Sequence, residues 1–402
     1  MSGHARGGPL AGIRVLAIAK VWAGPYTAKL LAQLGAEVLK VESTSSLDEM
    51  RAYGGLDIEH APYFLSQNTE ALSVRVNMKS AEGLARLKDM IAISDIVLDN
   101  LRPGAMAKLG LSFAEMQAIR PDIIHVSIKM YGSEGPLGPQ TGYAPSFGAI
   151  GGVTGLVGHE DRVPEGMNIR FGDTSAGAAA AFAAVAALHH RERTGEGQQV
   201  DLSAVETMSS LVGDRLLEYA LTGDVPRHRG NAHDALAPHG FFPCARNGWI
   251  SIACEEERDW QALCDGLDSP SLAKDARFAS LSQRRTHRAE LESELAALTA
   301  PHEACDLGAR LRAAGVAAYP AASSLDLMAS DTFWSNGTYR TVLNGNGDAR
   351  PVVGPSWRMT PDEADIANGA PTLGQHDDYV YRELLGLEEA EYDRLKANGA
   401  IS

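Results

Sequence analysis

Cysteine, aromatic side chains and long apolar runs are all scarce in this 402-residue sequence. The four cysteines, Cys244, Cys254, Cys264 and Cys305, form no CxxC pair and show no His/Cys zinc spacing. Isolated thiols are typical of a reducing compartment, so we expect a cytoplasmic protein without disulfides or a metal site. The apolar run nearest to the roughly 20 residues of a membrane span is the Ala-rich stretch 176–188, which we interpret as a buried helix.

Positive charge is also in short supply. The chain has 36 Lys and Arg against 51 Asp and Glu, which gives a net charge of −15. Such a chain repels nucleic acid and anionic membranes, so we expect neither as a partner. An anionic ligand would need a local basic pocket. Residues 1–9 have no apolar core of the signal-peptide kind, so no export signal is expected.

Motifs for the common cofactors are missing as well. The strand-turn-helix pattern at 13–34 has Gly24 followed by Pro25 and no GxGxxG, which argues against a nicotinamide or flavin site. The sequence contains no P-loop, HExxH, GxSxG or EF-hand pattern. We therefore expect no metal, nicotinamide or flavin cofactor.

Apolar strands and amphipathic helices alternate along the first half of the chain, which predicts an α/β fold with a parallel sheet. The expected strands are 13–19, 37–42, 95–100, 123–128 and 198–202, and the expected helices are 80–94, 113–119, 175–191 and 204–221. A polar stretch after 221 indicates a linker to a smaller α+β domain. We divide the chain into a large domain (1–221), a linker (222–240), a small domain (241–334), a loop-rich second linker (335–369) and C-terminal helices (370–402).

Eight segments, in order, resemble the family III CoA-transferases, also called the CaiB/BaiF family, which include formyl-CoA transferase. They are Pro9–Leu16 (PLAGIRVL), Val21–Pro25 (VWAGP), Leu34–Val38 (LGAEV) with Lys40–Glu42, Asp99–Gly104 (DNLRPG), Lys108–Gly110, Gly172-Asp173, Arg193–Gln198 (RTGEGQ), and Leu373–His376 (LGQH) with Glu383–Gly386. The resemblance implies a Rossmann-like large domain built from both chain ends and an interlocked-ring homodimer. It also implies CoA as a substrate, an acyl-CoA and a small carboxylic acid as ligands, and no permanently bound cofactor.

The resemblance assigns the nucleophile to Asp173. Taken alone, an Asp before an Ala-rich helix is interpreted as an N-cap, and the two roles can coexist. A carboxylate suits CoA transfer because it can form first a mixed anhydride with the acyl group and then a thioester with CoA.

The resemblance also implies a set of CoA-binding positions, with Lys79, Arg102 and Lys108 supplying positive charge. The set is Trp22, Ala23, Val76, Asn77, Met78, Lys79, Asn100, Leu101, Arg102, Lys108 and Tyr143. The simpler interpretation of each cation is a solvated surface charge, and of Trp22 a core or interface aromatic. The chain departs from the family at Ser43, Ala71 and Leu72, where many members have cations, which favours a different or weaker hold on the nucleotide.

Two alternatives share the fold. Relatives of α-methylacyl-CoA racemase use a His as second base, but the matching place here reads Gly142-Tyr143-Ala144. Tyrosine is a poor base at neutral pH, which disfavours a racemase. The other alternative is a heteromeric CoA-transferase, in which this chain would be the active subunit because it has Asp173.

Overall fold

The chain is divided between two units in the computed structural model, which describes residues 6–402 apart from 56, 161 and 166–169. The first unit combines Met1–Thr154 with Gly166–Leu217 and Thr332–Ser402. The second combines Gly155–Glu165 with Glu218–Asp331. The second unit is therefore an insertion into the first.

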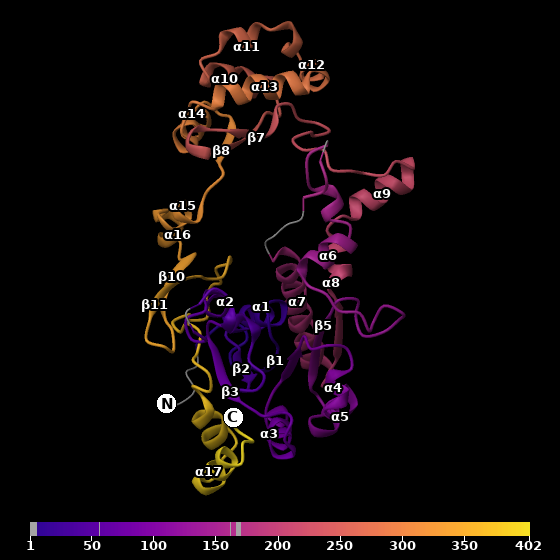
Figure 1. The fold of residues 1–402 in the computed structure, drawn as a ribbon, viewed down its shortest axis with the longest axis vertical. Coiled ribbons are helices and arrows are strands. Elements are labelled where there is room, and N and C mark those ends of the chain that lie inside the picture. The colour runs from indigo at the N-terminus through magenta and orange to yellow at the C-terminus, as the bar shows by residue number, and fades with distance from the viewer. Residues whose placement is uncertain (1–5, 56, 161, 166–169) are drawn as a thin grey trace. The chain divides into compact units, whose positions relative to one another are not determined.

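The first unit is built on a six-stranded parallel sheet in the order β3-β2-β1-β4-β5-β6 (Figure 1). The strands are β1 (Arg14–Ile18), β2 (Glu37–Glu42), β3 (Ala71–Arg75), β4 (Ile96–Asp99), β5 (Ile124–Lys129) and β6 (Gln199–Ser203). The central strands are short apolar runs because both of their faces are buried. This strand order is that of a Rossmann fold, so the predicted α/β architecture with a parallel sheet is confirmed.

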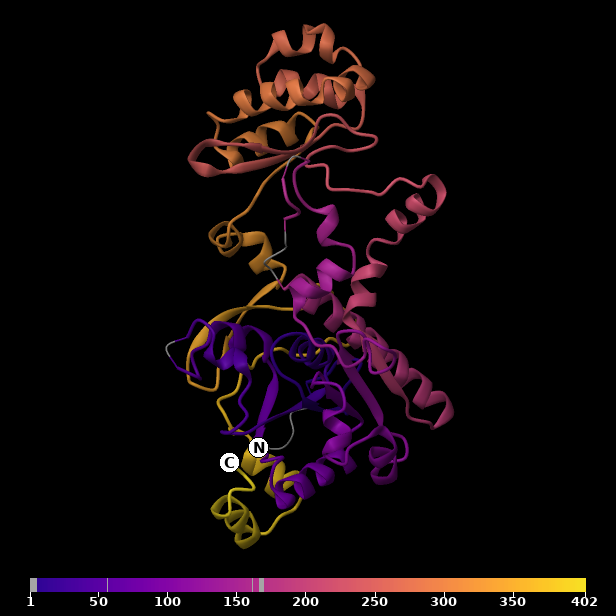
Figure 2. The same cartoon turned by 45° about the vertical axis from the view of Figure 1, so that its right-hand side comes forward.

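Helices cover both faces of the sheet (Figure 2). Because successive strand residues alternate, Val15 and Ala17 of β1 join the core on one face, and Leu16 and Ile18 join the core on the other. The first face carries α1 (Ala23–Gln33), α6 (Ala144–Ile150), α7 (Phe171–Thr194) and α8 (Ala204–Ser210); the second carries α3 (Ala81–Ala92), α4 (Ala105–Lys108), α5 (Phe113–Ile119) and α17 (Glu389–Ala397).

Helix α7 has the length and composition that a membrane span would need. Its alanines at four-residue spacing, Ala176, Ala180 and Ala184, nevertheless lie in the core of the first unit. Their small side chains let α7 pack closely against α1: a Cβ added at Gly177 would lie 2.7 Å from a backbone oxygen of α1. The helix is thus a core helix, as the Ala-rich stretch predicts.

The end of the chain returns to the sheet beside β3. The Ser73 amide donates to His376 Nδ1 at 3.1 Å, and Arg75 Nε lies 2.7 Å from Asp377 Oδ2. Beyond the strand, the Asn77 amide donates to the Ala400 carbonyl at 2.9 Å. The last residues of the chain therefore complete the second face of the sheet, where Figure 2 shows the yellow C-terminal segment beside α3.

The second unit has its own core around a three-stranded antiparallel sheet in the order β7-β8-β9. Its elements are β7 (His239–Pro243), β8 (Trp249–Ala253), α10 (Glu257–Gly266), α11 (Pro270–Lys274), α12 (Leu281–Thr286), α13 (Arg288–Thr299), α14 (Ala304–Ala313), β9 (Ala317–Pro320) and α15 (Ser324–Met328). Cys254 and Cys264 belong to this core, and burial raises the pKa of each thiol to about 12, so both stay protonated at neutral pH.

Several elements differ from the predicted pattern. The single helix predicted over 204–221 is two helices, α8 and α9 (Gly213–Thr222), because two serines and Gly213 weaken the helix at the break. The predicted loop after 335 contains a hairpin of β10 (Tyr339–Leu343) and β11 (Ala349–Val353), which Pro351 conceals from sequence patterns. The remaining short elements of the first unit are Glu49–Ala52, α2 (Pro62–Gln67) and a π-helix at Tyr379–Leu384, while Thr154–Leu156 and α16 (Asp331–Ser335) span boundaries between the units.

Candidate active site

The carboxyl ends of β1 and β4 lie side by side where the strand order reverses, which is the usual ligand site of a doubly wound sheet. Asn100, directly after β4, ties the two ends together: its Nδ2 donates to the Lys20 carbonyl at 2.7 Å, and its Oδ1 accepts from the Lys20 amide at 2.9 Å. A Cβ at Gly24 would lie 2.6 Å from Ala19 Cβ and 3.0 Å from Asn100 Cγ. Only glycine allows α1 to begin this close to the strand ends.

Asp173 lies in the first turn of α7, as the third residue of the helix. The N-cap position belongs to Arg170, so the interpretation of Asp173 as the cap is wrong: its backbone is already helical. Asp173 is only 8% exposed, and no described residue donates a hydrogen bond to its carboxylate. Burial raises its pKa to about 6, an effect that nearby Arg170 partly offsets. The positive end of the helix favours the ionised form as well.

The start of α6 packs directly against the start of α7. A Cβ at Gly172 would lie 3.0 Å from the Ala144 carbonyl oxygen. Tyr143 is the N-cap of α6 and is 69% exposed, so its side chain lies at the surface in this region rather than in the core. Gly172 thus lets α6 approach the segment that carries Asp173.

A cluster of aromatic rings surrounds Arg170, three residues before Asp173. The guanidinium carbon lies 4.1 Å from the ring centre of Tyr63 and 4.7 Å from that of Trp22. The two rings meet edge to face at 6.1 Å, and Tyr53 meets Tyr63 at 6.2 Å. The cluster therefore places a cation beside the buried carboxylate.

The side chain of Trp22 is positioned by a hydrogen bond to α7 and by the backbone conformation of the preceding residue. Its indole Nε1 donates to Thr174 Oγ1 at 3.2 Å, next to Asp173. The preceding residue, Val21, has a φ of +67°, a strained conformation for a β-branched side chain. Asp48 supports that backbone by accepting from the Val21 amide at 2.9 Å. Trp22 was among the residues predicted from the sequence, whereas Arg170, Tyr53 and Tyr63 were not, because no motif or spacing marks them.

Most of the predicted CoA-binding residues follow the carboxyl ends of strands, which lie at the same edge of a parallel sheet, whereas Lys108 ends α4 and Tyr143 precedes α6. Trp22 and Ala23 follow β1, residues 76–79 follow β3, and residues 100–102 follow β4. The structure divides them by exposure. Lys79, Arg102 and Lys108 are exposed, whereas Val76 is buried and Met78 and Leu101 pack against the core. Asn77 Nδ2 donates to the Gly399 carbonyl at 2.9 Å, so this side chain holds the chain end.

A buried ionic cluster supports the strand end that leads to Asn100. Asp99 accepts from His125 Nε2 at 2.9 Å and from Lys129 Nζ at 2.5 Å. Burial would raise the pKa of Asp99, but the hydrogen bond from His125 and the charge of Lys129 outweigh it and lower the pKa. Asp99 Oδ1 also accepts from the Leu101 amide at 3.0 Å, which fixes the loop after β4.

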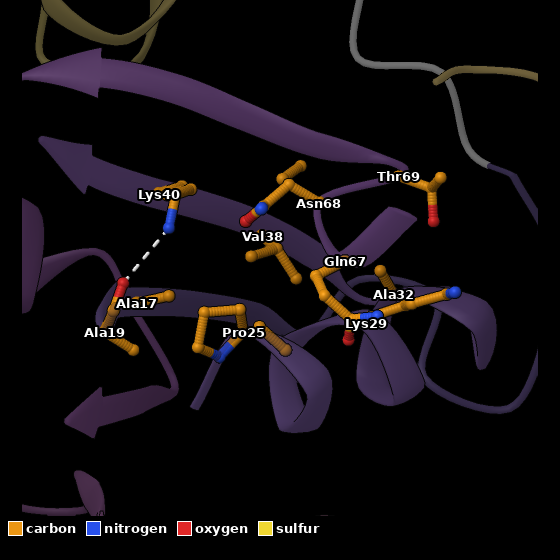
Figure 3. A pocket seen from close by; sticks show the side chains of 12 residues that line it. Ala17, Ala19, Pro25, Lys29, Ala32, Val38, Lys40, Gln67, Asn68 and Thr69 are labelled. Atoms are coloured by element: carbon orange, nitrogen blue, oxygen red, sulfur yellow. Dashed lines mark hydrogen bonds between the residues drawn. The ribbon is translucent and has the colours of Figure 1, made fainter. Parts of the chain in front are cut away.

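A small cavity lies between α1 and the strands β1, β2 and β3 (Figure 3). Its volume of about 10 Å³ suits one water molecule, not an acid or CoA. Figure 3 shows Lys40 Nζ donating to the Ala19 carbonyl at 3.1 Å, so this ammonium group is hydrogen-bonded within the fold. Among the described residues, no group of three or more His, Cys, Asp or Glu side chains could hold a metal ion.

The fold and this edge of the sheet define a doubly wound α/β protein with a buried carboxylate near its switch point. The profile of CoA-transferase family III matches residues 10–377, so the chain belongs to that family. Relatives in the same family act on named acids. The chain is 32% identical to the succinyl-CoA–D-citramalate CoA-transferase of Chloroflexus aurantiacus, with 98% of both chains covered.

Two further comparisons agree with this assignment. The alpha subunit of the succinyl-CoA–L-malate CoA-transferase of Chloroflexus aurantiacus is 29% identical, covering 98% of this chain and 92% of that subunit. The crystal structure of a CAIB/BAIF family protein from Brucella suis has a TM-score of 0.88 and 30% identity, covering 94% of this chain and all of that one. The sequence-based assignment to family III is therefore confirmed.

Proposed function

We propose that this CoA-transferase works through a covalent aspartyl-CoA thioester on Asp173. The observation that carries the proposal is a buried carboxylate at the start of α7, with no hydrogen-bond donor among the described residues. Such a group is partly desolvated and has free lone pairs, which makes it a better nucleophile than a solvated surface carboxylate.

The reaction balances without a redox change. An oxygen of Asp173 attacks the thioester carbonyl of the acyl-CoA, and the CoA thiolate leaves to give an acyl-aspartyl anhydride. The thiolate then attacks the aspartyl carbonyl, which releases the free acid and leaves Asp173 as a CoA thioester. The incoming acid attacks this thioester, and the thiolate released again attacks the acyl carbonyl of the new anhydride. A new acyl-CoA forms and the Asp173 carboxylate is regenerated.

CoA would lie along the carboxyl edge of the sheet, with Lys79, Arg102 and Lys108 near its phosphates. Their exposure leaves them free to meet an anion, and they provide positive charge that a −15 chain otherwise lacks. Val76, Asn77, Met78 and Leu101 would act through the backbone and through packing. Two relatives are named for succinyl-CoA, so we expect an acyl-CoA of that kind as the donor.

We further propose an interlocked homodimer in the cytoplasm, with the domain and linker boundaries predicted above. The structure describes every residue of helix α9, and none of them is buried. Even its leucines are exposed: Leu216 and Leu217 by about 60% and Leu221 by 78%. Exposed leucines on an amphipathic helix of this kind are typical of a surface that another chain covers. A heteromer with a homologous subunit remains the second candidate, because one relative is named as an alpha subunit.

The covalent step can be tested directly. The protein is incubated with succinyl-CoA, the thioester is reduced with borohydride, and the peptides are mapped by mass. We expect the Asp173 side chain to be recovered as a primary alcohol. A label on another peptide, or turnover by Asp173→Ala above a few per cent of the wild-type rate, would show that Asp173 is not the nucleophile.

A further inference from the structure

Arg170 has an arrangement that the transfer chemistry of Asp173 does not by itself require. Its guanidinium is stacked against the rings of Tyr63 and Trp22, at 4.1 and 4.7 Å from their centres. Stacking of this kind holds the plane of the guanidinium and strips water from its faces, but it leaves the N–H donors at its edges available. Stacking thus fixes the orientation of the side chain and leaves its N–H donors available for a ligand.

The edge donors of Arg170 have no acceptor among the described residues, since its side chain contacts them only through the rings of Trp22 and Tyr63. Other partly or fully buried arginines of the first unit differ: Arg51 binds the Glu42 carboxylate through two nitrogens, and Arg75 pairs with Asp377. Asp173 is the acid that Arg170 influences, yet it makes no hydrogen bond with it. A stacked guanidinium with free donors matches a planar carboxylate or phosphate.

The position of Arg170 relative to Asp173 limits what that anion can be. The guanidinium of Arg170 stacks on Trp22, whose indole donates to Thr174 next to Asp173, so it lies near the Asp173 carboxyl, whose pKa its charge lowers. A ligand carboxylate on Arg170 would therefore lie a few carbon atoms from a second carboxylate that reacts at Asp173. The ring cluster of Trp22, Tyr53 and Tyr63 would contact the short apolar segment between them.

We propose that Arg170 binds the non-reacting carboxylate of a short dicarboxylic acid, and so selects dicarboxylates over monocarboxylates. This rests on the proposed transfer through Asp173 and adds the feature of the acid that the site recognises. A CoA phosphate has similar chemistry, and the experiment below separates the two ligands.

The test compares succinate with butyrate, which has the same number of carbons and lacks one carboxylate. Enzyme carrying the Asp173–CoA thioester is mixed with either acid, and formation of the new acyl-CoA is followed over a single turnover. Arg170→Met should lose about 10- to 100-fold in rate at subsaturating succinate, the value of one charged hydrogen-bonding group, with butyrate changed less than about 3-fold. Arg170→Lys should lie in between, and added methylguanidine should restore succinate use by Arg170→Met.

Arg193→Met is the matched control, because Arg193 is an exposed arginine at the opposite end of the same helix. It should behave as wild type with both acids. Equal losses for succinate and butyrate in Arg170→Met would overturn the proposal and assign Arg170 to CoA binding or to the fold, as would wild-type enzyme that uses both acids equally. If Arg170→Met does not fold, the ratio of the two acids in Arg170→Lys decides. Wild-type enzyme that loads CoA but transfers it to no acid contradicts the proposed function instead.

Discussion

We expect the pH dependence of the reaction rate to follow the ionisation of the Asp173 carboxyl group. Burial raises its pKa to about 6, so below that pH most of the proposed nucleophile is protonated. We expect the rate of Asp173 acylation, measured by rapid quench between pH 5 and 8, to rise through pH 6 and then level off. Since Arg170 lowers this pKa, Arg170→Met should move the rise to higher pH. A flat profile in the wild type would contradict the assignment.

The same shift predicts a pH-dependent stability difference. A carboxyl group with a raised native pKa stabilises the fold when protonated, and this contribution disappears as the pH rises through about 6. Asp173→Asn cannot ionise, so at pH 8 it should be more stable than wild type by about 2–3 kcal/mol, and at pH 4 nearly equal. Urea unfolding of both proteins at the two pH values measures this. Reduced stability of Asp173→Asn at pH 8 would mean that the ionised carboxylate is well solvated or paired.

Among the residues, the resemblance to family III predicts Asp173 as the nucleophile, and the structure shows this residue buried at the start of α7. The sequence could not predict that Arg170 would be the N-cap, or that Tyr63 would stack on it. Tyr63 is 107 residues away in the chain, and only the folding of α2 toward α7 brings the two together. The cap assignment failed because α7 begins two residues before Asp173, a shift that terminal boundaries commonly show.

At the scale of elements, the loop after β2 supports the turn after β1. Asp48 is fully buried and joins the two: it binds Lys40 Nζ at 2.8 Å and accepts from the Val21 amide. The ion pair gives the strained turn a fixed shape, which in turn orients Trp22. A change at Asp48 should therefore disturb both stability and the aromatic cluster.

We predict that Asp48→Ala destabilises the protein by about 3–5 kcal/mol, since it leaves the buried Lys40 without its partner. The double variant Lys40→Met/Asp48→Ala should recover most of this loss, because it removes the unpaired charge. Guanidinium unfolding of the two single variants and the double variant completes the cycle. If the stability loss of the double variant equals the sum of the losses of the two single variants, the two side chains do not interact.

Local signals predicted most elements of the parallel sheet. Apolar runs such as 13–19 and 123–128 led to β1 and β5 nearly residue for residue, because strands buried on both faces need uninterrupted apolar sequence. The hairpin of β10 and β11 escaped, as its exposed strands carry polar residues and a proline. The break between α8 and α9 also depends on weak local preferences that a single sequence does not resolve.

For the whole molecule, α9 leads to a prediction about assembly. Its exposed leucines favour an oligomer. One chain has a mass of 42.7 kDa, and light scattering at micromolar concentration should give twice that mass. Leu217→Glu should weaken that assembly, while Glu196→Gln, at an exposed turn after α7, should not. A stable wild-type monomer would contradict the predicted dimer.

The return of the chain end to β3 also has a consequence for biosynthesis. Tyr381, Tyr392 and Leu395 complete the second core of the first unit, and they are synthesised long after the strands and helices of that core that lie between β1 and β5. Until then, nascent β3 and α3 expose the apolar surface that these side chains later cover. The inserted second unit, by contrast, has all its residues available before Thr332 is synthesised. We therefore expect the second unit to fold first during translation, and the first unit to be the one that relies on chaperones.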